Sequence, residues 1–139
     1  MALQRTLCII KPDAVERGHA GHILARVIEE GFRILALRQF RLGHAQAEGF
    51  YAVHRDRSFF AGLCTFMTRS PILVVALERE NAVQHWREVI GATDPAKASE
   101  GSIRKLYGAN IGENAVHGSD SDDNGRVECA YFFSGAELL

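Results

Sequence analysis

The sequence predicts an α+β fold in which helices cover a single sheet of four strands. Two patterns support this prediction: short apolar stretches rich in β-branched residues, and other stretches in which apolar residues recur at helical spacing. They follow one another in the order strand, helix, strand, helices, strand, helix, loop, strand and helix, for which a βαββαβ arrangement is a natural solution. From the length of 139 residues, we expect one domain that covers residues 1–139.

The first part of the chain predicts a strand, a helix and a second strand. Residues 6–11 are apolar and β-branched, which indicates a buried strand that ends at Pro12. Apolar residues at helical spacing predict a helix over residues 23–28, and Gly31 is placed to cap its C-terminus. Residues 32–42 predict a strand whose three arginines imply that one side faces water.

The middle of the chain predicts two helices and a central strand. A short helix is expected over residues 45–54 and another over residues 60–67, with Ser58 as the N-cap of the second. Residues 71–78 are apolar through their middle, which is typical of a buried central strand. Asn81 is placed to cap the helix that follows.

The last part of the chain predicts shorter elements. Residues 83–90 carry an apolar face and predict a helix, while residues 102–107 form a short helix at most. A short extended piece is expected at residues 115–117. A final helix is expected over residues 122–132, weakened by Gly125 in its interior.

Charge and cysteine content exclude several classes of protein. The net charge of −1, with acids and bases interspersed, argues against a surface built for nucleic acid or membranes, although a local cationic pocket is still allowed. Cys8, Cys64 and Cys129 form no CxxC pair, so we expect buried thiols in a reducing compartment. The apolar run at residues 7–10 is too short for a signal peptide or a membrane span, which indicates a cytoplasmic location.

The first candidate for a catalytic residue is His117, which lies within residues 114–120 between an apolar pair and a run of glycine and small polar residues. Ala115 and Val116 can fix the backbone to the core, and Gly118 leaves open space beside the ring. An accessible imidazole in a rigid setting suits a nucleophile or a base. On local chemistry alone, the alternative is a turn with an exposed histidine.

Cations and aromatic rings supply further candidates. Lys11 ends a buried strand, and Arg87 and Arg104 lie in helical settings, so the three could surround a phosphate chain. Each of them alone is more often a side chain whose charged end is solvated at the surface. Tyr51 and Phe59 lie on helices near a polar stretch, where a ring either packs in the core or stacks on a planar ligand.

Motifs of other phosphate-transferring and metal-binding proteins are absent from the sequence. It contains neither GxxxxGK[ST] nor GxGxxG, so any phosphate transfer works without a glycine-rich cradle. Four scattered aspartates show no spacing typical of metal ligands: Asp13, Asp56, Asp94 and Asp120. The remaining histidines have polar neighbours and are expected at the surface: His19, His22, His44, His54 and His85.

Four stretches together carry a resemblance to a known family: RTLCIIKPDAV at residues 5–15, GFYAVHRDRSFF at residues 49–60, GATDPAKASEGSIR at residues 91–104 and NAVHGSDS at residues 114–121. NAVHGSDS is similar to the active-site motif of the nucleoside diphosphate kinase family, and it is highly specific. The others resemble that family's opening strand with its phosphate-binding lysine, its nucleotide-binding helical hairpin, and its long loop with the following arginine. They occur in order and with matching spacing over nearly the whole chain.

The resemblance implies a phosphotransferase that moves the terminal phosphate of a nucleoside triphosphate to a nucleoside diphosphate. It implies a ping-pong mechanism through a phosphohistidine on His117. Residues that match the family's phosphate and ribose contacts are Lys11, Arg87, Thr93, Arg104 and Asn114, and Phe59 matches its base-stacking ring. Supporting roles fall to Lys11, to Tyr51 beside the histidine, and to the polar pair of Ser119 and Glu128.

The same resemblance implies a ferredoxin-like fold and Mg²⁺ that is bound mainly through substrate phosphates, with no direct metal ligand from the protein. It also implies a homo-oligomer, a tetramer or a hexamer built from dimers. Residues 23–28 and 32–42 carry more apolar area than one small sheet covers, so we expect at least an obligate dimer. Phe59 and nearby Leu63 offer only apolar surface to a base, which predicts broad base specificity.

Some positions depart from the pattern of the family. Ser58 stands where proline is common, and Arg69-Ser70 replaces the usual Ser-Gly before Pro71. Residues 105–107 replace a smaller and more acidic sequence, and residues 122–125 make the start of the last helix unusually acidic. None of them is an assigned catalytic residue, so they bear on loop stability, hairpin mobility and assembly.

Two other functions stay open on the residues alone. A histidine phosphocarrier or phosphatase needs no base-stacking ring and no ribose contacts, and a nucleotide exchange assay separates it from a kinase. A ferredoxin-like regulatory or nucleic-acid-binding module without catalysis predicts that His117 is never phosphorylated, and the near-neutral charge counts against it. The choice between tetramer and hexamer and the preferred nucleotide also stay open.

Overall fold

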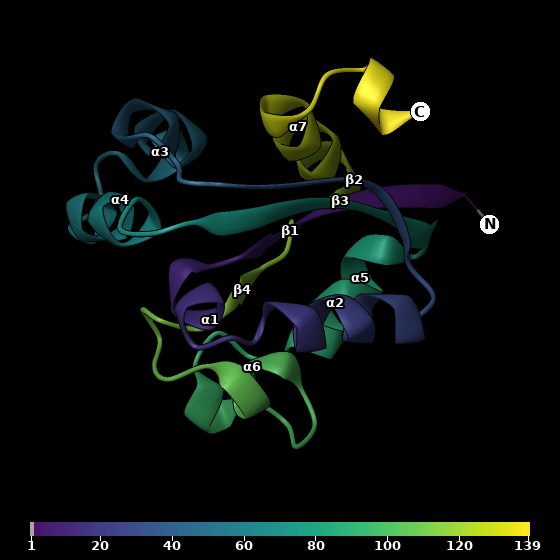
Figure 1. Ribbon diagram of the computed structural model, residues 1–139, viewed down its shortest axis with the longest axis horizontal. Helices are drawn as coiled ribbons and strands as arrows, with labels where there is room; N and C mark the ends of the chain where they lie inside the picture. Colours follow the sequence, from purple (N-terminus) through teal and green to yellow (C-terminus); the bar gives the residue numbers. More distant parts are fainter. Residues whose placement is uncertain (1) are drawn as a thin grey trace.

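A computed structural model describes residues 2–139 and contains one antiparallel sheet with helices on both faces (Figure 1). Its strands are β1 (Leu3–Ile10), β2 (Arg33–Phe40), β3 (Ile72–Glu80) and β4 (Val116–His117). They lie in the order β2-β3-β1-β4, and every neighbouring pair is antiparallel. The expected α+β fold with a four-stranded antiparallel sheet is therefore confirmed.

Seven α-helices and three short 3-10 helices connect and flank the strands in this part of the chain. The α-helices are α1 (Pro12–Glu16), α2 (Ala20–Glu29), α3 (His44–Phe50), α4 (Phe60–Met67), α5 (Ala82–Ile90), α6 (Ile103–Tyr107) and α7 (Asp122–Phe132). The 3-10 helices are Ala52–His54, Pro95–Lys97 and Ala136–Leu138.

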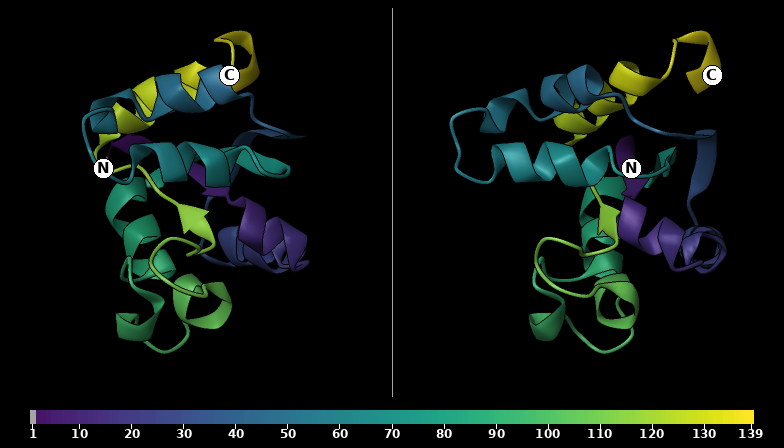
Figure 2. Two further views of the ribbon diagram at one scale, coloured as in Figure 1. Left: turned by 90° about the vertical axis from the view of Figure 1, so that its left-hand side faces the viewer. Right: turned by 60° about the vertical axis from the view of Figure 1, so that its left-hand side comes forward.

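The alternation of side chains along β1 and β3 builds two cores. On one face of the sheet, Cys8 and Ile10 pack with α2 and α5 around Trp86. On the other face, Leu7 and Ile9 pack with α3, α4 and α7. Figure 2 shows the same division, with α3 and α7 on one side of the sheet and α5 and α6 on the other. Because both faces are covered there, residues 7–10 of β1 and residues 72–77 of β3 are apolar throughout.

Several local expectations are corrected by the structure. Pro12 ends β1 but also begins the unexpected helix α1, since its missing N–H is no loss at the first turn of a helix. Phe59 rather than Ser58 occupies the N-cap of α4. Asn81 does occupy the N-cap of α5, in the left-handed conformation with φ 54°, but its side chain makes no capping bond.

Gly125 is required by packing rather than being a weak point of α7. A side-chain carbon at this position would lie 2.1 Å from the carbonyl oxygen of Arg5, so only glycine lets α7 approach β1 this closely. The helix begins at a true cap, because the Ser121 side chain accepts a hydrogen bond from the backbone N–H of Asn124 at 3.0 Å.

Two expectations from composition can be compared with the structure. Cys8, Cys64 and Cys129 are all free and buried, as expected. Within residues 2–139, none of the helices has the length and apolar character needed to cross a membrane.

Candidate functional site

The pairing of β1 with β4 brings the ends of the chain's two most informative motifs together. Ile9 lies opposite His117 in the sheet. Just beyond the end of β1, the backbone N–H of Lys11 donates to the carbonyl oxygen of Ala115 at 2.8 Å. Lys11 and the candidate histidine are therefore held next to each other at the ends of adjacent strands, on a rigid part of the fold.

The imidazole of His117 is oriented by a carboxylate from α7. Its Nε2 lies 2.8 Å from Oε1 of Glu128, and the hydroxyl of Ser119 donates to the same oxygen at 2.6 Å. The Ser119 oxygen in turn accepts the backbone N–H of Leu7 at 2.9 Å. A carboxylate only accepts hydrogen bonds, so Nε2 must carry the proton and Nδ1 keeps its lone pair. With one-fifth of the His117 side chain exposed, the ring is both held and accessible.

The backbone before His117 takes an unusual conformation that a buried carboxylate stabilises. Ala115 has φ 74°, a region that costs energy for any residue with a side chain. Its N–H donates to Oδ2 of the buried Asp13 at 3.1 Å. Burial raises the pKa of Asp13, while the bonds to the backbone and the charge of Lys11 act against that rise. No role was predicted for Asp13 from the sequence, where its position directly after Lys11-Pro12 was the only signal.

Lys11 points at the candidate site and is tied to Asn114. Its Nζ donates to Oδ1 of Asn114 at 2.9 Å, and Nδ2 of Asn114 donates to the carbonyl oxygen of Thr93 at 3.1 Å. Burial, reinforced by the positive charge of Arg104, lowers the pKa of Lys11 to about 8, although Asp13 opposes the shift. An ammonium in this environment is poorly solvated and would be stabilised by an anion.

Two arginines line a cavity of about 170 Å³ that reaches Gly118, the residue after His117. Arg104 is fixed by bonds to the carbonyl oxygens of Gly91 at 3.0 Å and Val116 at 2.9 Å, whereas Arg87 is exposed. Burial and the nearby charge of Arg87 lower the pKa of Arg104 to about 10. The complete lining is Arg87, Ile90, Gly91, Thr93, Arg104 and Gly118. Concentrated positive charge with little compensation suits a phosphate group.

Gly118 keeps the histidine against the core. A side-chain carbon at this position would lie 2.8 Å from Cδ1 of Trp86, so any other residue would push the strand end away from α5. The indole N–H of Trp86 lies 3.3 Å from the carbonyl oxygen of His117, to which it donates. The sequence placed Trp86 in the core and did not anticipate that it also contacts the candidate nucleophile.

The aromatic candidates occupy two different positions. The ring next to His117 is that of Phe50, at 5.7 Å between centroids in an edge-to-face arrangement, and the ring of Tyr51 meets that of Phe50 edge-to-face at 4.9 Å. The buried hydroxyl of Tyr51 has no partner within residues 2–139, and burial together with the charge of Glu128 raises its pKa. Phe59 is 47% exposed and lies on the α3–α4 connection. Its ring meets His54 and the guanidinium of Arg57 rather than His117 or Phe50.

The same region offers no cage for a metal ion. Across residues 2–139 there is no group of three or more histidine, cysteine, aspartate or glutamate side chains that could hold one. The cations of the site are instead suited to an anion, or to a metal that arrives already bound to phosphates.

Comparisons with known proteins agree with this geometry. The family model for nucleoside diphosphate kinase matches residues 4–138. A nucleoside diphosphate kinase of Sorangium cellulosum is 64% identical over 138 residues, which cover 99% of this chain and 96% of that protein. One from Geobacter sulfurreducens is 56% identical over 137 residues, covering 99% of this chain and all of that protein.

Solved structures show the same similarity in three dimensions. The Aquifex aeolicus nucleoside diphosphate kinase superposes with a TM-score of 0.96 at 45% identity, covering 99% of this chain and 100% of that chain. A halophilic nucleoside diphosphate kinase from Halobacterium salinarum, in complex with CDP, gives a TM-score of 0.94 at 36% identity, covering 99% of this chain and 92% of that chain.

Proposed function

This chain belongs to the nucleoside diphosphate kinase family, and we propose that His117 is the residue that carries the phosphate during its reaction. The protein is a nucleoside-diphosphate kinase, a phosphotransferase that acts on nucleotides. The observation that supports His117 is the bond from its Nε2 to Glu128 at 2.8 Å, which leaves Nδ1 with a free lone pair beside a cationic cavity.

The proposed reaction has two symmetrical halves. In the first, the lone pair of His117 Nδ1 attacks the terminal phosphorus of a nucleoside triphosphate. The bond from that phosphorus to the bridging oxygen breaks, and the nucleoside diphosphate leaves with the electron pair. In the second half, a terminal oxygen of another diphosphate attacks the phosphohistidine, and Nδ1 regains its lone pair. Nε2 keeps its proton throughout, so the hydrogen bond to Glu128 stabilises the positive charge that develops on the ring.

The cations of the site support the charge distribution that the transfer needs. Lys11, Arg87 and Arg104 offset negative charge on the phosphate oxygens as the bond breaks. Asn114 and Thr93 complete the contacts to phosphate and ribose. Ser119 and Glu128 hold the ring of His117, and Tyr51 supports it by packing against Phe50, whose ring meets that of His117.

Mg²⁺ belongs to this proposal as part of the substrate. Because the described residues form no three-ligand group, the triphosphate itself would supply most of the ligands. When bound, the ion neutralises part of the phosphate charge. The residues of this chain then need only to bind and orient the complex.

The proposal extends to specificity, assembly and location. Phe59, half-exposed on the α3–α4 connection, is the base-stacking ring, and a stacking contact predicts tolerance of all common bases. The protein assembles from dimers into a tetramer or a hexamer. Three buried free thiols fit a reducing compartment, which supports a cytoplasmic location.

The test is phosphate transfer from labelled ATP to GDP through an isolated intermediate. We expect wild-type protein to acquire label that is labile in acid and stable in base, and then to release it to GDP. His117→Ala should lose both steps, by at least about four decades in rate as for other essential nucleophiles. His22→Ala, at an exposed histidine outside the site, is the control and should keep both.

Other results would contradict the assignment in distinct ways. Label that passes to water but not to GDP would indicate a phosphocarrier or phosphatase. Active His117→Ala protein, with label on a different histidine, would show that His117 is not the nucleophile. Absence of any label on wild-type protein would favour a module without catalysis.

A further inference from the structure

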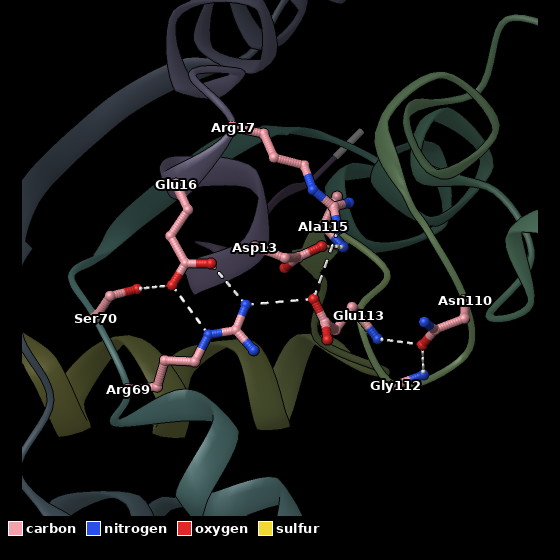
Figure 3. A network of polar contacts seen from close by, with 9 residues as sticks. All are labelled: Asp13, Glu16, Arg17, Arg69, Ser70, Asn110, Gly112, Glu113 and Ala115. Carbon is pink, nitrogen blue, oxygen red and sulfur yellow. Dashed lines mark hydrogen bonds and ion pairs between the residues drawn. The ribbon is translucent and has the colours of Figure 1, made fainter.

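A network of polar contacts joins three segments of the chain beside the proposed site (Figure 3). Arg69 contacts Glu16 with two nitrogens: Nε donates to Oε2 at 2.9 Å, and one terminal nitrogen donates to Oε1 at 2.6 Å. The Ser70 hydroxyl donates to the same carboxylate at 2.6 Å. That terminal nitrogen of Arg69 also lies 3.3 Å from Oε1 of Glu113, and Arg17 lies 3.8 Å from this oxygen.

Each of the three segments leads directly to proposed substrate contacts. Glu16 ends α1, the short helix that begins immediately after Lys11. Glu113 immediately precedes Asn114 in the chain. Arg69 lies between α4 and β3, so it is attached to the central sheet. The guanidinium thus links a rigid element to the two segments that carry Lys11 and Asn114.

The loop before Asn114 depends on Glu113 for its connection to the rest of the protein. The Asn110 side chain accepts the backbone N–H groups of Gly112 and Glu113, and the Glu113 carbonyl oxygen accepts those of Ala109 and Asn110, so the loop closes on itself. Among residues 2–139, the side-chain hydrogen bonds and ion pairs that tie residues 108–113 to other segments are those of the Glu113 carboxylate.

From this arrangement we infer that Arg69 is a positioning residue for nucleotide binding. By holding Glu113 next to Glu16, it fixes the Asn114 carboxamide, which accepts the hydrogen bond from Lys11. This inference rests on the proposed function, which makes Lys11 and Asn114 substrate contacts. The contact departs from the family pattern that the sequence resembles, because neither member of the usual Ser-Gly pair carries a charge.

Charge explains why Arg69 is needed. Glu16 and Glu113 are two carboxylates that reach the same guanidinium nitrogen, and without it they would repel each other. Hydrogen bonds from Arg69 and Ser70 lower the pKa of Glu16 to about 2, so this carboxylate is ionised at neutral pH. Each ion pair is partly exposed, with 39% of the Arg69 side chain accessible. A single pair of this kind contributes little, but a two-pronged contact within a network holds a defined geometry.

The experiment compares two phosphate donors in the Arg69→Gln variant. For transfer from ATP to GDP we expect kcat/KM to fall about 3- to 10-fold, the effect of losing a partly exposed charged contact. The second donor is phosphoramidate, whose nitrogen–phosphorus bond breaks as phosphate passes to His117 and ammonia leaves. Phosphoramidate has no ribose and does not need Asn114. The rate at which it phosphorylates His117 should therefore change less than twofold. General damage to the fold would lower both rates together.

Matched variants distinguish the network from other effects. Arg41→Gln removes an exposed arginine that donates to the neighbouring Thr68 carbonyl oxygen at 2.9 Å without meeting a carboxylate, and it should leave both rates unchanged. Arg69→Lys keeps the charge but loses the two-pronged contact, so its kcat/KM should be intermediate. Combining Arg69→Gln with Glu113→Gln should cost no more than Glu113→Gln alone, because the first acts through the second.

Several results would overturn the inference. They are an unchanged kcat/KM for nucleotides in Arg69→Gln, an equal fall with both donors, and additive losses in the double variant. If Arg69→Gln does not fold, the same comparisons are made with Arg69→Lys. Failure of the wild-type protein to exchange phosphate between nucleotides would instead refute the proposed function, and the inference with it.

Discussion

Around His117, side chains form hydrogen-bonded pairs, and each member fixes the position of the other. Glu128 binds Nε2 and thereby leaves Nδ1 as the free nitrogen, while Ser119 fixes the carboxylate of Glu128 from the other side. In the same way, Asn114 holds the ammonium of Lys11 by its oxygen and the backbone at Thr93 by its nitrogen. Removing one member of such a pair disorders the other as well.

The pKa of Lys11 predicts an alkaline limit to activity. Burial and Arg104 lower it to about 8 from a usual value near 10.5. The ammonium is required to bind phosphate, so kcat/KM for ATP should decrease as pH rises through about 8. A bound triphosphate restores the charged form, so kcat should persist to higher pH. We would measure both from pH 6 to about 10, limits chosen to bracket these values.

Lys11→Gln protein is the control for this pH dependence. It cannot lose a proton at that position, so its much lower kcat/KM should not show the same alkaline decrease. A wild-type kcat/KM that stays constant up to pH about 10 would contradict the account of Lys11.

Phe59 predicts how the protein treats different bases. Stacking contributes on the order of 1–3 kcal/mol per base and hardly distinguishes one base from another. Specificity constants for ATP, GTP, CTP and UTP should therefore lie within about two decades, with purines ahead because of their larger rings. Phe59→Ala should lower all four and narrow the purine advantage. Val53→Ala changes an 87% exposed side chain on the same connection and should leave all four specificity constants unchanged.

The structure adds neighbours to Phe59 that bear on this result. The ring is met by His54 at 5.4 Å and by the guanidinium of Arg57 at 5.8 Å, so polar groups do stand near the proposed base. If steady-state kinetics with one fixed acceptor gave a preference above about a thousandfold, more than stacking can supply, a hydrogen bond to the edge of one base would be responsible. The stacking account would then fail.

At the scale of elements, the sequence predicts the strands and helices whose burial gives a periodic pattern. It does not predict features that depend on close contact between residues distant in the chain. The buried stretches of β1 and β3 and the apolar faces of α2 and α5 were predicted because burial imposes a pattern on consecutive residues. Helix α1 was missed because five residues are too few to show a period, and Pro12 ends one element while it begins another. Gly125 was judged by helix propensity, whereas its contact with Arg5 is set by a residue distant in sequence.

The same distinction holds for the site. Its polar residues were found because the motif at residues 114–121 and the resemblance identify them locally. The contribution of Asp13 to the backbone of Ala115 and that of Phe50 to the ring of His117 arise only when α1, α3 and the segment that leads into β4 come together. No spacing in the sequence encodes these contacts. The Arg69 network was visible from the sequence only as a departure from the family pattern.

Gly125 gives a test of close approach between elements. Gly125→Ala places a carbon 2.1 Å from the Arg5 carbonyl oxygen, so α7 must shift from β1. We expect a loss of about 1–3 kcal/mol or more in the free energy of unfolding, typical of overpacking. Urea unfolding at a fixed protein concentration measures it, since assembly also affects stability.

Gly21→Ala in α2 is the matched control for this substitution. A carbon added at Gly21 meets nothing within 4 Å. There the same change should stabilise by about 0.4–1 kcal/mol, because alanine restricts the unfolded chain. Equal effects at both positions would show that helix propensity, and not contact with β1, governs Gly125.

At the scale of the whole molecule, the longer of the two edge strands of the sheet is β2, with eight residues. Within residues 2–139, β2 pairs with β3 on one side and with no strand on the other. The apolar side chains of Ile23 and Val27 are buried in the chain's own core. The exposed apolar area that the sequence led us to expect is therefore reduced to a few residues. Ile28 and Leu37 remain, 59% and 41% exposed, on α2 and β2.

This open edge predicts self-association through β2. Native proteins rarely leave a long edge strand uncovered, because its free N–H and C=O groups pair readily with another chain. A second copy of the same chain can cover the edge and bury Leu37, so light scattering at micromolar concentration should give at least the mass of a dimer. Leu37→Lys adds a charge to the edge strand and should shift the mass toward the monomer. Val127→Lys, at a 67% exposed residue in the middle of α7 and not on β2, should leave the mass unchanged. A monomeric wild-type protein would refute the prediction, and equal effects of both substitutions would assign the interface elsewhere than β2.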